Sequence, residues 1–265
     1  MAEESNIYDG QSVAIFTDVF SLVGKQALQF PSSSAILAPG RESLAYAGLW
    51  EQLGNTGDRL RGLGISQDDR VAVILPNGPE MATAFLAVAS CAVCAPLNPA
   101  YQAAEFRFYL EDLKARAVLV LEGTDSPARQ VAVELGLIVL EIRVDTARPA
   151  GCFELLAPGG GEPMQRELDI TRKTALILYT SGTTSRPKIV PLTHANLMSS
   201  AVNIARFLSL SDQDRCLNVM PLFHIHGLVA ALLSSLASGG SLICTAGFDA
   251  NRFFGWIGQY QPTWY

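Results

Sequence analysis

Apolar residues along the chain gather in short runs, and stretches of helical periodicity lie between these runs. The runs are rich in Val, Ile and Leu, which is typical of strands that are buried on both faces. From these runs we predict six strands, at residues 70–76, 116–122, 137–144, 174–180, 214–220 and 241–246.

Four stretches between the runs carry apolar residues at helical spacing. We predict helices at 79–92, with Pro79 in the first turn; at 103–113; at 194–208, with Thr193 as N-cap; and at 228–236, which is almost entirely apolar. Strands that alternate with helices predict an α/β fold with mixed, largely parallel sheets flanked by helices.

Two other segments follow neither pattern. Residues 146–165 are rich in Gly and Pro, and we expect a surface loop that leads to the strand at 174–180. The sequence ends on Trp264 and Tyr265, two large aromatic residues that are unusual at a natural terminus. We therefore expect that the sequence stops inside a fold.

The composition narrows the class of protein. The chain has 265 residues, 49% hydrophobic and 17% charged, which suits a folded α/β protein and excludes a disordered one. A net charge of −6 argues against nucleic-acid binding but leaves room for a local basic site. Residues 81–104 and 216–248 lack formal charge, but Pro, Asn, Gln or Gly interrupt them. We therefore expect core helix and strand there, and no integral membrane segment.

The cysteines and the first residues bear on the compartment. Five cysteines in a long chain argue against a disulfide scaffold and favour a reducing cytosol. Cys91 and Cys94 form a CxxC without a second metal-binding pair, so we expect buried thiols there. The start, MAEESNIYDG, is acidic and polar, unlike a signal peptide. We expect a cytoplasmic protein, with a peroxisome as the alternative in a eukaryote.

The segment SGTTSRPK directly follows the apolar run 174–180, and ligands of open α/β sheets bind beyond the carboxyl ends of strands. Gly182 allows close backbone approach, and Lys188 offers a positive charge to a phosphate. The hydroxyl donors are Thr180, Ser181, Thr183, Thr184 and Ser185. The Walker A pattern is absent because Ile189 follows Lys188. On the residues alone, a phosphate-binding loop and an ordinary turn remain equally open.

The segment YTSGTTSRPK (179–188) resembles the signature loop of the adenylate-forming superfamily, whose usual form is close to YTSGTTGxPKG. That superfamily includes acyl-CoA synthetases, firefly-type luciferases and peptide-synthetase adenylation domains. Further segments of the chain resemble other parts of these proteins, namely 75–99, 191–197, 220–228 and 262–265. The resemblance therefore extends over most of the chain.

Two positions depart from the usual loop. Ser185 replaces a Gly, and Ile189 stands where Gly is common. A β-branched residue does not readily hold a positive φ, so we predict an extended backbone at Ile189. The combination of TSGTTSRPK with PLFHIHGL is similar to the oxalate–CoA ligases (peroxisomal-type coenzyme A synthetases).

The resemblance assigns roles to residues at both motifs. It implies that ATP phosphates are bound by Thr180, Ser181, Gly182, Thr183, Thr184, Ser185 and Lys188, with Thr184 acting indirectly on Mg²⁺. It makes His224 the catalytic gate beside the carboxylate and the adenylate, and it places His224, His226 and Gly227 at the acyl site. Without the resemblance, a histidine on an apolar segment is more often a hydrogen-bonded core residue, and we expect this of His194. We expect the flanking residues Met220, Leu222 and Phe223 to pack.

The implied reaction is that of an ATP-dependent carboxylate–CoA ligase. A carboxylate attacks the α-phosphate of Mg-ATP to form an acyl-adenylate, and the thiol of coenzyme A then displaces AMP. We expect oxalate as the acid. Two alternatives are a ligase for a fatty or aryl acid and a non-catalytic phosphate- or nucleotide-binding module.

The resemblance also predicts the domain organisation. Residues 1–265 would be a truncated large N-terminal AMP-binding domain of the acyl-CoA synthetase fold, with subdomains at 1–65 plus 210–265 and at 66–209. The C-terminal domain would be absent, so we expect that this chain alone does not complete catalysis.

Overall fold

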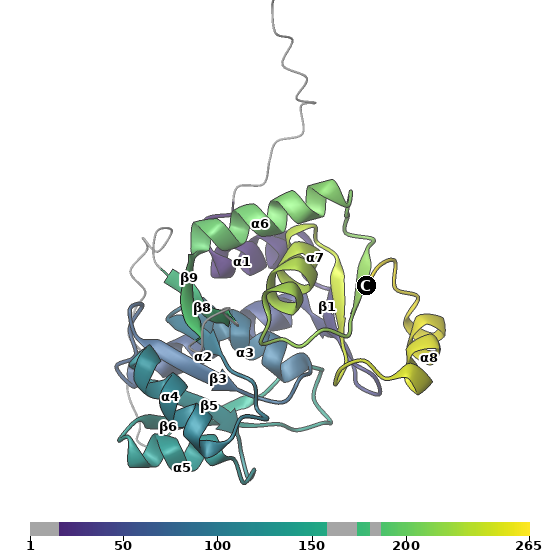
Figure 1. Cartoon of the computed structure of the whole chain (residues 1–265). Helices are drawn as coiled ribbons and strands as arrows, with labels where there is room; N and C mark the ends of the chain where they lie inside the picture. The colour runs from purple at the N-terminus through teal and green to yellow at the C-terminus, as the bar shows by residue number, and fades with distance from the viewer. Residues whose placement is uncertain (1–15, 158–173, 181–186) are drawn as a thin grey trace, which may run out of the picture.

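The computed structural model describes residues 16–157, 174–180 and 187–265, which form two β-sheets with helices packed against them (Figure 1). The larger sheet has the strand order β7-β6-β5-β3-β4-β8-β9. Its strands are β3 Arg70–Ile74, β4 Val93–Pro96, β5 Ala117–Leu121, β6 Ile138–Arg143, β7 Glu154–Leu156, β8 Thr174–Thr180 and β9 Lys188–Thr193. The central strands run parallel, and β7 and β9 lie antiparallel at the two edges.

The smaller sheet joins two distant parts of the chain, in the order β10-β11-β1-β2. Its strands are β1 Ser34–Leu37, β2 Leu44–Ala45, β10 Arg215–Asn218 and β11 Ser241–Cys244. Strand β1 pairs in parallel with β11, so Ile36 lies opposite Leu242. The smaller sheet thus takes strands from 34–45 and 215–244, whereas the larger takes its strands from 70–193. The subdomain boundaries near residues 65 and 210 stay a prediction.

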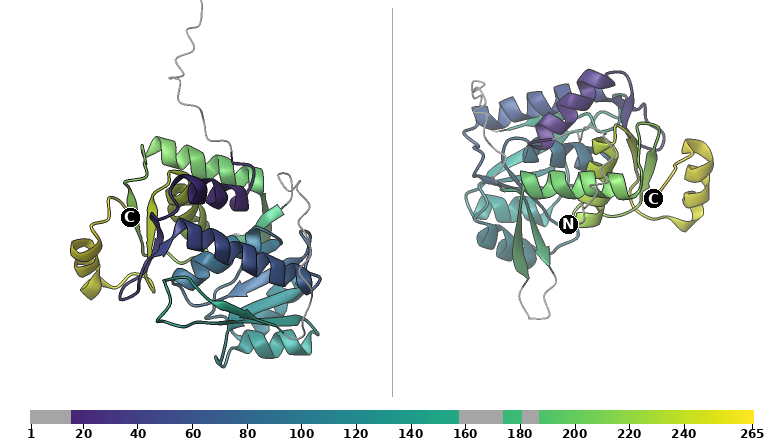
Figure 2. Two further views of the ribbon diagram at one scale, coloured as in Figure 1. Left: turned by 180° about the vertical axis from the view of Figure 1, so that it is seen from behind. Right: turned by 90° about the horizontal axis from the view of Figure 1, so that it is seen from above.

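The helices form the layers around these sheets, as two further views show (Figure 2). They are α1 Val19–Gln29, α2 Tyr46–Gly62, α3 Pro79–Ala89, α4 Ala103–Leu113, α5 Pro127–Glu134, α6 His194–Phe207, the π-helix η1 His226–Leu233, α7 Ser234–Ala237 and α8 Ala250–Tyr260. The largest buried cluster joins the facing sides of both sheets through α1, α2, α3, α6 and the η1–α7 helix. Helices α4 and α5 cover the other face of the larger sheet, and α8 covers the other face of the smaller one.

The predicted α/β fold with mixed, largely parallel sheets flanked by helices is confirmed. All six predicted strands are present, as β3, β5, β6, β8, β10 and β11. Helix α3 begins at Pro79 as predicted but ends at Ala89, because the chain turns there to enter β4. The helix predicted at 228–236 begins earlier, at His226, and its first part is π-helical.

Nearby residues explain where two helices begin, α3 after strand β3 and α6 after strand β9. The backbone N–H groups in the first turn of a helix have no partner within the helix, so a proline, which lacks an N–H, costs nothing there. The fixed φ of Pro79 also suits the first position of α3. Thr193 caps α6 as predicted, since its hydroxyl accepts a hydrogen bond from the Asn196 N–H at 3.2 Å. Ile189 lies in β9 opposite Tyr179, which confirms the extended backbone predicted for this residue.

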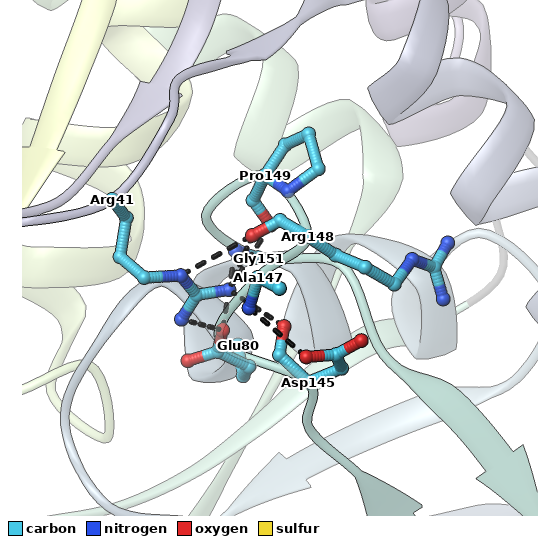
Figure 3. A network of polar contacts seen from close by, with 7 residues as sticks. All are labelled: Arg41, Glu80, Asp145, Ala147, Arg148, Pro149 and Gly151. Atoms are coloured by element: carbon cyan, nitrogen blue, oxygen red, sulfur yellow. Dashed lines mark hydrogen bonds and ion pairs between the residues drawn. The ribbon is translucent and has the colours of Figure 1, made fainter.

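A polar network holds the β1–β2 loop of the smaller sheet against the larger one (Figure 3). The guanidinium of Arg41 contacts a Glu80 oxygen at 3.1 Å, and their side chains are only 12% and 17% exposed. Arg41 also donates to the carbonyls of Arg148 and Pro149, at 3.0 and 3.1 Å. The Gly151 N–H completes the network by donating to the same Glu80 carboxylate.

Two further expectations concern the apolar stretches. None of the helices in the described ranges combines the length and the apolar character that crossing a bilayer requires. All five cysteines are buried, including Cys91 and Cys94 of the CxxC, as the apolar sequence around them predicts. Burial raises the pKa of the Cys94 thiol far above its ordinary range, with a smaller contribution from Cys91.

Candidate functional site

A cleft of about 590 Å³ opens at the carboxyl end of β8. Its walls come from the β8–β9 pair, from helix α6 and from the segment at 223–230. Figure 2, in the view from above, shows β8 and β9 beside α6. Of the residues proposed from sequence, Thr180, His224 and His226 line this cleft. The fold therefore brings the end of the signature strand and the histidine motif to one place, although they lie far apart in the sequence.

Of the residues predicted to bind phosphate, the structure describes Thr180 and Lys188. Thr180 is the last residue of β8 and Lys188 the first of β9, and they lie directly opposite each other across the antiparallel pair. Both are exposed, so their hydroxyl and ammonium groups are accessible to a ligand. Opposed residues of such a pair share one face of the sheet. The remaining predicted phosphate ligands, Ser181, Gly182, Thr183, Thr184 and Ser185, lie outside the described residues.

The β8 strand is fixed to its neighbours just before the cleft. The Tyr179 hydroxyl donates to an Asp112 carboxylate oxygen at 2.9 Å, and its ring lies edge-on to Tyr109 with centroids 4.6 Å apart. Burial raises the pKa of Tyr179 above its ordinary range, and the hydrogen bond to Asp112 raises it further. Tyr179 therefore stays a neutral hydroxyl that holds the end of β8 against α4.

The two histidines predicted to lie at an acyl site face the cleft from a turn. His224 and His226 are both exposed, at the entry to the η1 helix. The ring of Phe223 lies beside that of His224, with centroids 4.5 Å apart. An exposed imidazole in a cleft can donate a hydrogen bond to a bound ligand, such as a carboxylate, or accept one from it. A histidine enclosed in the core is not accessible to a ligand. The turn therefore offers two polar groups within a largely apolar wall.

Gly227 does not line the cleft, but the turn requires it. A Cβ at this position would lie 2.7 Å from the carbonyl oxygen of Pro221, closer than real Cβ atoms approach backbone. The same carbonyl accepts a hydrogen bond from the His224 N–H at 3.2 Å. Gly227 thus allows the close packing that sets the path of the His224 turn.

The neighbours of the histidines differ from the expectation in part. Leu222 is fully buried, as expected of a packing residue, and Phe223 lines the cleft. The expectation was wrong for Met220, which is 37% exposed. His194 is buried at the start of α6, where its Nδ1 accepts a hydrogen bond from the Val19 N–H at 3.4 Å, which fits the structural role expected for it.

Sequence reasoning missed several residues that line the cleft. They are Tyr179, the residue before the end of β8, and Asn196 and Ser200, which lie one turn apart on α6. The spacing of Asn196 and Ser200 puts them on one helix face, which is a usable signal once the cleft is known. The apolar wall is made by Leu178, Val190, Leu192, Leu197, Ile204 and Val229.

Comparison with known proteins identifies the family. The sequence profile described as AMP-binding enzyme matches residues 23–265. The chain belongs to the AMP-binding enzyme family. The family resemblance predicted from the signature loop and the histidine motif is thereby confirmed.

Two curated relatives illustrate the family. The chain is 38% identical over 254 residues to a Humulus lupulus protein named "Probable CoA ligase CCL9", and 37% identical over 253 residues to an oxalate–CoA ligase of Arabidopsis thaliana. These matches cover 92% of this chain but only 47% and 48% of the two relatives. The chain thus spans about half the length of these AMP-binding enzymes.

The crystal structure of apo MatB from Rhodopseudomonas palustris superposes with a TM-score of 0.76. The match covers 92% of this chain and 48% of that one, at 24% identity. At this identity the likeness supports the AMP-binding enzyme fold alone.

Proposed function

We propose that this chain forms the phosphate- and carboxylate-binding part of an ATP-dependent carboxylate–CoA ligase. The observation that carries the proposal is the position of Thr180, His224 and His226 in one cleft, with Lys188 opposite Thr180 at the ends of β8 and β9. Membership of the AMP-binding enzyme family supports the same reaction.

At the phosphate side, the Thr180 hydroxyl can donate to a phosphate oxygen and the Lys188 ammonium can offset negative charge. The described residues contain no group of three or more His, Cys, Asp or Glu side chains that could hold a metal. In the proposed site, Mg²⁺ would be held chiefly by the phosphate oxygens of ATP. When bound, Mg²⁺ neutralises part of the charge that develops on the transferred phosphate.

At the carboxylate side, His224 and His226 can donate hydrogen bonds to the acid and hold one oxygen toward the α-phosphate. That oxygen forms a bond to phosphorus, and pyrophosphate leaves. The thiol of coenzyme A then loses its proton and attacks the acyl carbon, and AMP leaves. Neither step needs a nucleophile from the protein, so the proposed role of these residues is to orient the reactants and stabilise charge.

We propose oxalate as the acid, because a small dianion needs polar donors where a fatty acid needs only apolar space. The two exposed imidazoles and the similarity to an oxalate–CoA ligase support this choice. One observation favours the alternative, a ligase for a fatty or aryl acid. Leu178, Val190 and Leu192 are among the many apolar residues in the wall of a cleft that is large for oxalate.

The test is carboxylate-dependent exchange of pyrophosphate into ATP, measured on a protein that extends this chain to the length of its relatives. The acids are oxalate, acetate, a medium-chain fatty acid and a coumarate-like acid. We expect exchange chiefly with oxalate, and exchange chiefly with another acid would contradict the substrate proposal. Replacing His226 with Leu should lower exchange with oxalate and spare or raise exchange with the fatty acid.

Lys188→Met tests the phosphate side, with Lys25→Met as a matched control, because Lys25 is also exposed and lies on α1, which does not line the cleft. Only Lys188→Met should raise the KM for Mg-ATP.

The isolated chain is used to test the alternative function, a module that binds phosphates without catalysis. A rise in melting temperature with Mg-ATP, combined with no exchange by the extended protein for any acid, would favour that rival. Completed thioester formation by the 265-residue chain alone would contradict the expectation that it is incomplete. We also retain a cytoplasmic location as part of the proposal.

A further inference from the structure

The turn that carries His224 donates a hydrogen bond to a residue just beyond a strand of the larger sheet. Asn77 follows β3, at the carboxyl edge of the larger sheet, and its Oδ1 accepts a hydrogen bond from the Leu222 N–H at 2.8 Å. Its Nδ2 donates to the carbonyl of Thr245, just after β11 in the smaller sheet, at 2.9 Å. We propose that Asn77 is a positioning residue that fixes the His224 turn over the end of β8. This inference rests on the proposed role of His224 at the carboxylate.

The two bonds define the orientation of the Asn77 amide. The Leu222 N–H can only donate and the Thr245 carbonyl can only accept, so one orientation of the amide satisfies both. Leu222 is fully buried and Thr245 is 1% exposed. Loss of the side chain would therefore leave a buried donor and a buried acceptor without partners, rather than expose them to water.

The other hydrogen bonds of this turn stay within their own segment. The Asn218 side chain accepts from the Met220 N–H at 3.2 Å and donates to its carbonyl at 3.0 Å. The His224 N–H bonds to Pro221, and the His224 carbonyl accepts from Leu228. Among the hydrogen bonds described for residues 220–224, the one to Asn77 is the one that reaches the larger sheet.

That bond therefore sets where the turn stands relative to the phosphate side. Strand β3 neighbours β4, and β4 neighbours β8, which ends at Thr180. Through these paired strands, Asn77 relates the Leu222 backbone to the end of the signature strand. His224 follows Leu222 by two residues, so a displaced Leu222 shifts the imidazole within the cleft without changing its chemistry.

The expected consequence is a loss of alignment rather than a loss of ATP binding. A shift of about 1 Å in a reacting group lowers the rate by about 100-fold. We therefore expect Asn77→Leu to lower kcat for exchange by roughly 10- to 100-fold. The KM for Mg-ATP should stay unchanged, because Thr180 and Lys188 do not depend on the turn.

Three variants separate positioning from general stability. Asn77→Leu removes both bonds at similar side-chain size, and Asn77→Asp places a carboxylate oxygen against the Thr245 carbonyl, so both should displace the turn. Gln52→Leu is the matched control in α2. Gln52 is 9% exposed and its side chain donates to the Phe153 carbonyl at 2.9 Å, so this change also removes a buried amide. Asn77→Ser, too short for either bond, replaces Asn77→Leu if the latter does not fold.

Two readouts are used, and the first does not require any activity. In the isolated chain, ¹H–¹³C spectra of the histidine rings report the environment of His224, whose ring lies 4.5 Å from that of Phe223. We expect Asn77→Leu to shift or broaden the His224 signal while the buried His194 signal stays, and Gln52→Leu to leave the His224 signal in place. The second readout is kcat and KM for exchange in the extended protein, where the variants should follow the same order.

The outcomes are distinct. The proposal is wrong if Asn77→Leu leaves the His224 signal and kcat unchanged, or if Gln52→Leu shifts that signal or lowers kcat as much. If the wild-type extended protein exchanges with no acid, the proposed function fails, and the histidine spectra still decide whether Asn77 positions the turn.

Discussion

Replacing Gly227 with Ala tests the packing that shapes the His224 turn. Gly227 is the second residue of η1, and a Cβ there would meet the Pro221 carbonyl oxygen at 2.7 Å and the Pro221 carbonyl carbon at 3.2 Å. Both atoms are backbone, so no flexible side chain can move aside. Gly54 in α2 is the matched control, since a Cβ there would have nothing within 4 Å. Neither glycine has a positive φ, so the two substitutions differ in space and not in backbone strain.

Two opposing effects determine how much each substitution changes the free energy of unfolding. Ala stabilises a helix relative to Gly by about 0.5–1 kcal/mol, because Gly loses more backbone freedom on folding. Overpacking a tightly packed position destabilises by about 1–3 kcal/mol. Gly54→Ala should therefore raise the free energy of unfolding by about 0.5–1 kcal/mol. For Gly227→Ala the clash should outweigh the propensity, and we expect a net loss of about 1–2 kcal/mol.

The assay is urea unfolding of the isolated chain, followed by circular dichroism, with the histidine ring spectra recorded in parallel. Because the Pro221 carbonyl also accepts the His224 N–H, Gly227→Ala should move the His224 signal, and Gly54→Ala should leave it in place. If Gly227→Ala is as stable as Gly54→Ala and the His224 signal does not move, then Gly227 does not constrain the turn and the reasoning is refuted.

Three further predictions concern stability. Arg41→Met removes hydrogen bonds from a poorly exposed guanidinium and should cost about 1.5–3 kcal/mol by urea unfolding. Arg252→Met, whose side chain is 73% exposed in its ion pair with Asp249, should cost under about 0.5 kcal/mol, and equal losses would contradict the role of the network. Burial opposes ionisation of Asp214, but hydrogen bonds from Thr263 and Ser211 outweigh it and lower the Asp214 pKa below its ordinary value of 3.8. The stabilisation is then complete above that value and is lost as the pH falls through the lower folded-state pKa, so the deficit of Asp214→Asn in urea should shrink at acidic pH; a constant deficit would argue against the lowered pKa. Burial raises the pKa of the Cys216 thiol to about 12, although a hydrogen bond with Ser235 lowers it. All five thiols are buried, so a thiol reagent at pH 8 should react only as fast as the chain unfolds. Rapid reaction in the native state would show that the core opens without unfolding.

The local sequence determined the strands and helix starts that depend on nearby residues. Strands buried on both faces must be apolar along their length, which is why β3, β5 and β8 could be located from composition alone. The starts of α3 and α6 depend on Pro79 and Thr193, whose effects reach only the first turn. The family resemblance could also be recognised from the sequence, because the signature loop and the histidine motif are each one unbroken segment of the chain.

Several elements carried too weak a local signal. Helix α2 contains Gly48, Gly54 and Gly57, which lower its intrinsic helix propensity, and sequence reasoning did not identify it. Strand β9 contains Pro191 and begins with an exposed Lys188, features that a strand tolerates at a sheet edge. Its pairing with β8 defines it, and that pairing depends on residues outside β9 itself.

Only the tertiary structure decided which distant residues meet. The smaller sheet pairs Ile36 with Leu242, the cleft brings Thr180 to His224, and Asn77 bonds to Leu222 across 145 positions of sequence. Side-chain periodicity records which face of an element is buried, but it does not record against which partner. Those contacts follow from the packing of two sheets around shared helices. The sequence alone could therefore propose His224 and His226 as site residues, but it could not propose Asn77 as the residue that positions their turn.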